Sequence, residues 1–198
     1  MNSKKRAPVC YIVAGPNGAG KTTFALSYLP EISGCRNFIN ADMIAQGLSP
    51  LDPEAVQMEA GRLFIKEIEN KVKLRKDFSF ETTLSGRAYL RLIRELHASG
   101  WIIKLFYLCL PDSVFSSKRV RERVKQGGHD IPDDAIKRRF PRSVSNLFVY
   151  MGNCDYTICY DNSQTIPELI FEKDAKGIRI ENSIKFDMLK RISNYGKN

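Results

Sequence analysis

The chain has 198 residues, with 31 Lys and Arg against 22 Asp and Glu, which gives a net charge of +9. Its 43% hydrophobic and 27% charged content is ordinary for a globular domain, and no apolar run is long enough for a membrane span. Its five cysteines lack C-x-x-C spacing, and residues 1–8 lack the apolar centre of a signal peptide. We therefore expect reduced core cysteines and a cytoplasmic protein. The positive charge indicates an acidic partner, either a nucleotide or a nucleic acid.

The first element in the chain is an apolar run over residues 9–14, rich in β-branched and aromatic side chains, which predicts a buried strand. A helical pattern begins after Lys21. Between the two lies G-P-N-G-A-G-K-T-T, which fits G-x-x-x-x-G-K-[ST] in the strand–loop–helix context that this phosphate-binding motif requires. The residues expected to bind nucleotide, here called the phosphate loop, are Gly15, Pro16, Asn17, Gly18, Ala19, Gly20, Lys21, Thr22 and Thr23.

The composition of this loop has a chemical reason. Glycines allow backbone angles that let several N–H groups converge on one anion, and the following helix adds the positive end of its dipole. Lys21 is expected to contact the β- and γ-phosphates of ATP, and the Thr22 hydroxyl to ligate Mg²⁺. A plain glycine-rich turn is the alternative, which the flanking strand and helix patterns disfavour. ATP and Mg²⁺ are therefore the expected cofactors.

The rest of the chain alternates between strand and helix patterns. Strands are predicted over 37–40, 78–80, 101–110 and 155–160, and helices over 54–75, 87–99, 113–126 and 132–150. Pro141 is expected to kink or split the last of these helices. The tail after residue 161 suggests an edge strand and a terminal helix, in a C-terminal extension (163–198) of uncertain role. This alternation predicts an α/β fold in a single domain (1–198), with a parallel sheet of about five strands covered on both faces.

In such sheets ligands bind outside the carboxyl ends of the strands, which directs attention to polar residues at those positions. Asp42 follows the second strand and could serve as a base toward a hydroxyl acceptor, or could instead cap a short helix over 43–46. Glu81, Thr82 and Thr83 follow the third strand and could hold Mg²⁺ waters or a polyhydroxyl substrate, or form a polar turn. Asp112 is expected to cap the following helix.

Basic residues concentrate between positions 118 and 142, where nine Lys and Arg face four acidic residues. Arg119 and Arg123 are four residues apart and so share one helix face. The guanidinium group suits phosphate because of its planar fork of donors. We therefore predict a basic lid over residues 113–142, hinged at Gly127-Gly128. A solvated basic helix face is the alternative.

Several stretches, taken together, carry a family resemblance. The chain contains, in this order, GPNGAGKTTFA, FINAD, SFETTLSGR, RVRERVKQGGHDIP with the following IKRRF, and YDNS. Over residues 10–163 the chain resembles the zeta-toxin family of phosphate-loop kinases, particularly its stand-alone chromosomal branch. The resemblance implies a nucleotide-kinase-like three-layer α/β sandwich with a helical lid. It also implies transfer of the ATP γ-phosphate to the 3′-hydroxyl of the amino sugar in UDP-N-acetylglucosamine.

Position by position, the resemblance makes Lys21 the phosphate-binding lysine and Asp42 the catalytic base. It makes Glu81 and Thr83 substrate-site residues, and Arg119 or Arg123 the lid arginine that stabilises the transferring phosphoryl group. The family's second lid arginine has no obvious counterpart, although His129 lies in that neighbourhood of the sequence. The resemblance implies an antitoxin protein as a partner, whereas the helical extension of plasmid-borne relatives is absent before the first strand here.

The sequence leaves two other functions to consider. The charge of +9 raises a nucleic-acid-binding ATPase or a polynucleotide 5′-hydroxyl kinase, but the basic residues cluster at the lid instead of alternating with aromatics along a track. A transporter-type ATPase is rejected because residues 84–87, Leu-Ser-Gly-Arg, lack the second glycine and the glutamine of its signature. A small-molecule kinase is the preferred interpretation.

Overall fold

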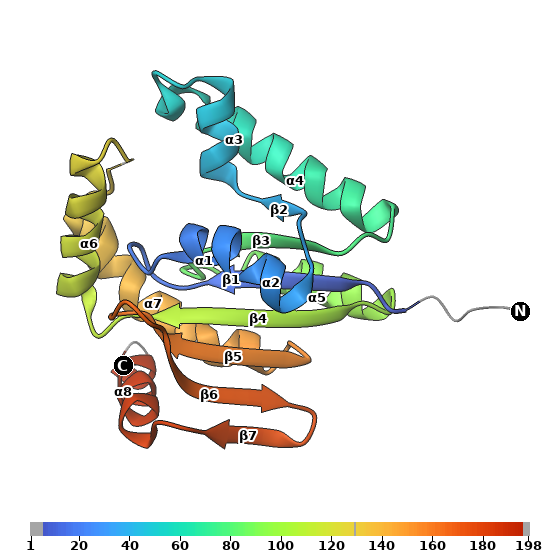
Figure 1. The fold of residues 1–198 in the computed structure, drawn as a ribbon, viewed down its shortest axis with the longest axis vertical. Helices are drawn as coiled ribbons and strands as arrows, with labels where there is room; N and C mark the ends of the chain where they lie inside the picture. Colours follow the sequence, from blue (N-terminus) through green and yellow to red (C-terminus); the bar gives the residue numbers. More distant parts are fainter. Residues whose placement is uncertain (1–5, 129, 196–198) are drawn as a thin grey trace, which may run out of the picture.

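The structure is a computed structural model that describes residues 6–128 and 130–195. Its described strands form one seven-stranded sheet in the order β2-β3-β1-β4-β5-β6-β7 (Figure 1). Their bounds are β1 Val9–Ala14, β2 Phe38–Ile39, β3 Phe78–Thr82, β4 Ile102–Cys109, β5 Tyr156–Asp161, β6 Glu168–Asp174 and β7 Gly177–Ile180. The first five strands are parallel, which confirms the predicted α/β fold.

β1 is the middle one of the five parallel strands, and all six of its residues are buried. It pairs in parallel with β3 on one side and β4 on the other. Ala14, its last residue, is in register with Thr82 and with Tyr107. The phosphate loop therefore leaves the sheet between the carboxyl ends of two neighbouring strands, where ligands bind in such folds.

Helices cover both faces of this sheet. Their bounds are α1 Lys21–Ser27, α2 Leu29–Ser33, α3 Ala41–Leu48, a 3₁₀ turn at Pro53–Val56, α4 Gln57–Lys73, α5 Tyr89–Ala98, α6 Ser113–Lys125, α7 Asp133–Met151 and α8 Ser183–Tyr195. In Figure 1, α1 lies in front of the sheet and α5 and α7 lie behind it, which gives the expected three layers. α6 stands at the end toward which β1 and β4 point.

The C-terminal tail differs from expectation, because it adds two strands to the sheet where the sequence suggested one. β6 runs antiparallel to β5, and β7 antiparallel to β6. A register shift beside Tyr160 interrupts the pairing of β5 with β6, and Ile170 and Phe171, which are consecutive in β6, are both fully buried. Two adjacent buried residues break the alternation by which a strand is recognised, so the sequence did not reveal β6.

The terminal helix predicted from the sequence is present and belongs to the core. Phe186 of α8 packs edge-on against Phe171, with ring centroids 5.2 Å apart, and against Phe148 of α7 at 6.2 Å. Leu189 of α8 is fully buried. The tail is thus held to the sheet by apolar packing.

Pro141 does not split its helix, so that part of the prediction is wrong. α7 continues from Asp133 to Met151 with Pro141 inside it. A proline removes one backbone hydrogen bond, but the helix is buried on both sides of it, at Phe140 and at Val144. The free energy gained by burying this face of α7 offsets the loss of that backbone hydrogen bond.

Two expectations from composition can also be compared with the structure. The five cysteines are buried and unpaired, as expected for core residues. Among residues 6–128 and 130–195, no helix is both long and apolar enough to cross a membrane.

The packing around Gly15 gives a stability prediction. A Cβ atom built on Gly15 would lie 2.1 Å from the Leu108 carbonyl oxygen of β4, and Gly15 has φ +146°. We expect Gly15→Ala to lower the free energy of unfolding by roughly 2–3 kcal/mol, because both strain and a backbone clash are introduced. Urea denaturation measures this difference. Gly61→Ala in α4, where nothing lies within 4 Å, is the control and should be neutral or stabilising by up to about 1 kcal/mol. Equal stability of the two variants would contradict the packing argument.

Candidate functional site

The phosphate loop has the backbone conformation that its glycines allow. Gly15, Gly18 and Gly20 have φ values of +146°, +73° and +78°. Gly20 is the residue before α1, which begins at Lys21. The Lys21 side chain, 7% exposed, folds back over the loop and donates a hydrogen bond from Nζ to the Pro16 carbonyl oxygen at 2.9 Å. The loop thus forms a closed turn around a buried ammonium group at the start of a helix.

Three charged residues act on Lys21. Burial lowers the pKa of the Lys21 ammonium below its ordinary value, the Glu81 carboxylate opposes this, Arg123 adds to it and Asp42 again opposes it. Glu81, Arg123 and Asp42 therefore lie within electrostatic reach of the lysine. The structure therefore brings together four residues that the sequence selected from four separate segments.

The three polar residues at the end of β3 point to different places. Glu81 Oε2 accepts a hydrogen bond from the Thr22 hydroxyl at 2.7 Å, which places the carboxylate beside the phosphate loop. Thr82 Oγ1 accepts from the Leu84 backbone N–H at 3.1 Å, and Thr83 Oγ1 is 2.9 Å from Ser85 Oγ. Thr82 therefore stabilises a polar turn, which was the alternative prediction for this segment, whereas Glu81 lies beside the phosphate loop.

Asp42 does not cap the helix that follows it. The N-terminal cap of α3 is Asn40, whose Oδ1 accepts a hydrogen bond from the Met43 backbone N–H at 3.0 Å. Asp42 is the second residue of α3 and is exposed. The capping alternative is thus wrong for Asp42, and its carboxylate faces an open hollow. By contrast, Asp112 is a cap as predicted, accepting from the Phe115 N–H at 2.7 Å.

The hollow beside Asp42 consists of two adjoining parts, of about 530 and 630 Å³, which we call the Asp42 cavity. Volumes of this order are typical of small-molecule sites. Both parts share four polar residues: Asp42, Glu54, Gln57 and Asp130. Asn17 of the phosphate loop, Thr83 and Arg139 line the second part. The cavity therefore opens directly onto the phosphate loop.

Arg139 is a site residue that the sequence did not single out. Among the described residues that line the Asp42 cavity it is the one cation. A signal was present in the sequence, because Arg139 lies four residues after Ala135 and four before Ser143, and both of these are buried. An arginine on the buried stripe of α7 has to point into the protein or into a cavity. His129, which we weighed for the neighbourhood of the second arginine, lies outside the described residues.

Arg119 and Arg123 have different surroundings although they share a helix face. The Arg119 guanidinium donates to the carbonyl oxygens of Asn162 at 2.7 Å and Ser163 at 2.9 Å. Arg123 instead influences the pKa of Lys21. A Cβ atom on Gly128 would lie 2.5 Å from Arg123 Cγ, so the turn after α6 packs tightly on that side chain. Of the two, Arg123 is the one placed toward the buried lysine.

The predicted lid lies over the phosphate loop, and its first helix rests directly on it. Ser116 Oγ donates to the Asn17 carbonyl oxygen at 2.5 Å, and a Cβ atom on Gly18 would lie 2.9 Å from the Ser116 carbonyl oxygen. At the other end of α6, the Gly127 and Gly128 N–H groups donate to the carbonyls of Val124 and Arg123, a common way to end a helix. Motion of this segment stays a prediction.

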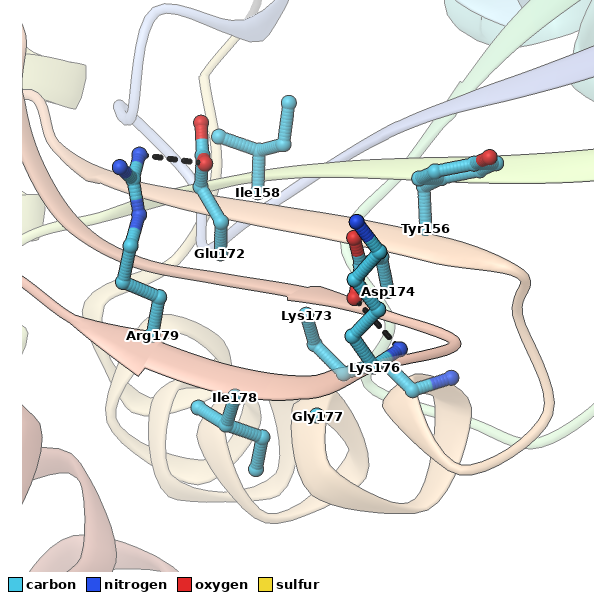
Figure 2. Close-up of a pocket in the computed structure, with 9 residues that line it drawn as sticks. All are labelled: Tyr156, Ile158, Glu172, Lys173, Asp174, Lys176, Gly177, Ile178 and Arg179. Atoms are coloured by element: carbon cyan, nitrogen blue, oxygen red, sulfur yellow. Dashed lines mark hydrogen bonds and ion pairs between the residues drawn. The ribbon is translucent and has the colours of Figure 1, made fainter.

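A third hollow, of about 560 Å³, lies at the β6–β7 hairpin (Figure 2). Figure 2 shows Arg179 of β7 reaching its neighbour Glu172 of β6, with Arg179 Nη2 and Glu172 Oε2 2.7 Å apart, and Tyr156 at the other end of the hollow. None of the predicted site residues lines this hollow. In the described part of the chain, no group of three or more His, Cys, Asp or Glu could hold a metal ion by itself.

The chain is similar to several known proteins in sequence or in fold. A curated protein of Haemophilus influenzae, described as uncharacterized, is 29% identical over 126 residues, which is 64% of this chain and 88% of that protein. Among solved structures, an AvrRxo1-ORF1:-ORF2 complex with ATP has a TM-score of 0.71 at 15% identity, over 96% of this chain. This chain spans 65% of the length of that chain.

A second similar structure comes from the PezAT chromosomal toxin–antitoxin system of Streptococcus pneumoniae, with a TM-score of 0.65 at 15% identity over 98% of this chain and 87% of that one. At such low identities these likenesses concern the fold. The decisive match is a family model, described as Zeta toxin, that covers residues 1–165. Because this match extends over most of the sequence, the chain belongs to the zeta toxin family.

Proposed function

We propose that this protein is an ATP-dependent phosphotransferase that moves the γ-phosphate to a hydroxyl of a small acceptor bound in the Asp42 cavity. The observation that carries the proposal is the adjacency of two sites. Asn17 belongs to the phosphate loop and also lines the cavity that holds Asp42 and Arg139. A γ-phosphate in the loop would therefore face an acceptor in the cavity, as in-line transfer requires.

The loop residues suit the phosphates of ATP. The buried Lys21 ammonium supplies a positive charge, and the N–H groups at the start of α1 supply donors. The ammonium and the N–H groups support ATP as the phosphoryl donor. Asn17 is 7% exposed, and its Oδ1 has no hydrogen-bond partner among the described residues, so it retains an acceptor for a hydroxyl group or a water beside the phosphates.

Thr22 and Glu81 fit a magnesium ion. A hydroxyl and a carboxylate 2.7 Å apart are oxygen ligands of the kind that Mg²⁺ prefers, directly or through water. When bound there, Mg²⁺ would neutralise charge on the β- and γ-phosphate oxygens. We therefore assign Glu81 to the metal side of the site, whereas Thr83, which lines the Asp42 cavity, is the β3 residue assigned to the acceptor.

Asp42 is the proposed general base. Its carboxylate is exposed to the cavity, is not used as a helix cap and lies near Lys21. It can accept the proton of the attacking hydroxyl while the phosphoryl group is transferred. Arg123 of α6 acts on Lys21, and Arg139 of α7 lines the cavity; we propose that both stabilise the charge on the transferring group. Arg139 then fills the role of the second lid arginine.

For the acceptor, we propose the amino-sugar 3′-hydroxyl of UDP-N-acetylglucosamine, or of a nucleotide sugar like it. Carboxylates, amides and a hydroxyl line the cavity, and such groups bind the hydroxyls of a sugar. Arg139 is positioned to meet an anionic part of the acceptor. The described lining has one cation, Arg139, which could pair with one anionic group but not with the successive phosphates of a nucleic-acid backbone, so a polynucleotide kinase is the less favoured alternative.

An antitoxin protein is the partner that we propose for this chain. The support is family membership, together with the likeness of the fold to the PezAT toxin–antitoxin structure. Co-purification of the chain with the product of a neighbouring gene, followed by a test of whether that product inhibits transfer, would examine this proposal.

Lys21→Met tests nucleotide binding. Removal of the charge at nearly constant size should weaken Mg-ATP binding roughly 10- to 100-fold, because charge-assisted hydrogen bonds to phosphate are lost. Isothermal titration calorimetry measures the affinity, and circular dichroism confirms the fold. An unchanged affinity in a folded variant would remove the phosphate-loop assignment.

Asp42→Asn tests the base. The amide keeps the shape of the side chain but cannot accept a proton, so transfer should fall roughly 10²–10⁴-fold while Mg-ATP affinity is retained. Transfer is measured with labelled ATP on a panel of nucleotide sugars, polyols and a 5′-hydroxyl oligonucleotide. Full transfer by the variant to every acceptor that wild type uses would show that Asp42 is not the base. Label found on the oligonucleotide alone would overturn the proposed acceptor.

Arg123→Ala and Arg119→Ala separate the two arginines of α6. Arg123→Ala should lower the rate of transfer by up to roughly 10³–10⁵-fold with little change in ATP affinity. Arg119→Ala should act mainly on ATP affinity, because this guanidinium holds backbone carbonyls. The control is Arg121→Ala, on the exposed side, where Arg121 pairs with Asp133. Near-normal kinetics for Arg123→Ala would leave α6 as a solvated basic helix.

A further inference from the structure

The loop that follows β5 contacts the phosphate loop directly. Asn162 Nδ2 donates a hydrogen bond to the Ala19 carbonyl oxygen at 2.8 Å. A Cβ atom built on Gly20 would lie 2.7 Å from the same Nδ2 atom. The Asn162 side chain therefore rests on the peptide that joins Ala19 to Gly20, immediately before α1.

This contact fixes which way that peptide faces. In a trans peptide the C=O and N–H groups point in opposite directions, and no described peptide bond is cis. Because Asn162 holds the Ala19 carbonyl on its own side, the Gly20 N–H must point away from Asn162. Glycine at position 20, with φ +78°, could otherwise adopt other orientations at little cost. The hydrogen bond from Asn162 thus fixes the orientation of one donor of the phosphate loop, the Gly20 N–H group.

Asn162 is in turn held from two sides. Arg119 donates to its carbonyl oxygen and to that of Ser163. On the other side is Asp161, the last residue of β5, whose Oδ1 accepts from the Ser163 N–H at 2.8 Å. The remaining carboxylate oxygen of Asp161 forms an ion pair with Lys185 Nζ of α8 at 2.6 Å.

The pair between Asp161 and Lys185 is largely shielded from water, with side-chain exposures of 6% and 28%. Burial raises the pKa of the Asp161 carboxyl, but hydrogen bonds from Lys185 and Ser163 outweigh this and hold the pKa below its ordinary value. Asp161 is therefore charged at neutral pH, and removal of Lys185 would leave a buried carboxylate without its cation. Lys185 also contacts Glu168 at 2.5 Å, but Glu168 is half exposed.

We infer that Lys185, in the C-terminal helix, is a positioning residue for the phosphate loop, acting through Asp161 and Asn162 on the peptide between Ala19 and Gly20. This inference rests on the proposed binding of ATP, and it assigns a role in that binding to the C-terminal part of the chain. Lys185 touches neither the loop nor the Asp42 cavity, so its effect passes through the β5 loop.

The test is Mg-ATP affinity measured by calorimetry on the full chain. Lys185→Met should weaken binding roughly 3- to 30-fold, the range typical of residues that act through a contact network. Asn162→Asp removes the Nδ2 donor and should weaken binding to a similar degree or more. Glu168→Gln is the matched control, since it loses only the outer partner of Lys185, and should bind as wild type does. Lys185→Arg should restore most of the affinity.

The double variant Lys185→Met/Asn162→Asp distinguishes positioning from general destabilisation. If Lys185 acts through Asn162, the double variant should bind Mg-ATP no more weakly than the single variant that has the lower affinity. If the two residues act independently, the two fold-losses in affinity would multiply. A folded Lys185→Met with wild-type affinity, or multiplicative losses, would overturn the inference. If Lys185→Met does not fold, Asp161→Asn is measured in its place. This variant should lose Mg-ATP affinity to the same degree, and wild-type affinity in it would also overturn the inference. Failure of wild type to bind Mg-ATP would instead contradict the proposed function.

Discussion

The backbone of the phosphate loop is the constraint on which the rest of the structure depends. Three glycines give the loop its shape, and each is contacted by a different element. Gly15 lies against the Leu108 carbonyl of β4, Gly18 against α6, and Gly20 against Asn162 after β5. These close approaches leave no room for side chains, so the central sheet, α6 and the loop after β5 all meet at one backbone segment. The shape of the proposed nucleotide site and the packing of the fold are therefore linked.

Electrostatics impose a second requirement at the same place. A buried ammonium is costly without partners, and Lys21 is surrounded by Glu81 and Asp42, whose charges favour its protonated form, and by Arg123, whose charge opposes it. The formal charges of these two cations and two carboxylates sum to zero, which offsets part of the cost of burying the ammonium.

Local patterns in the sequence were enough to predict the parallel part of the fold and the phosphate loop, because β1 is uniformly apolar and the loop motif is specific. They predicted Asp42 and Glu81 as site residues, since strand ends in a parallel sheet converge. The partner of Glu81 was not predictable, because Thr22 lies 59 positions away and only the register of β1 with β3 brings the two together. Arg139 was not singled out because it lies among neighbouring basic residues that face solvent. β6 was missed because its register shift breaks the alternation, and the connection from Lys185 to Asn162 depends on tertiary contacts alone.

The most direct test of the central claim is the stoichiometry of the reaction. Wild-type protein would be incubated with Mg-ATP and a mixture of nucleotide sugars and polyols, and the ADP, free phosphate and phosphorylated acceptor would be quantified together by mass spectrometry. If the protein is a phosphotransferase, each ADP formed is matched by one phosphorylated acceptor hydroxyl, with little free phosphate. ADP accompanied by an equal amount of free phosphate, whatever acceptor is present, would show that the protein is an ATPase and not a phosphotransferase.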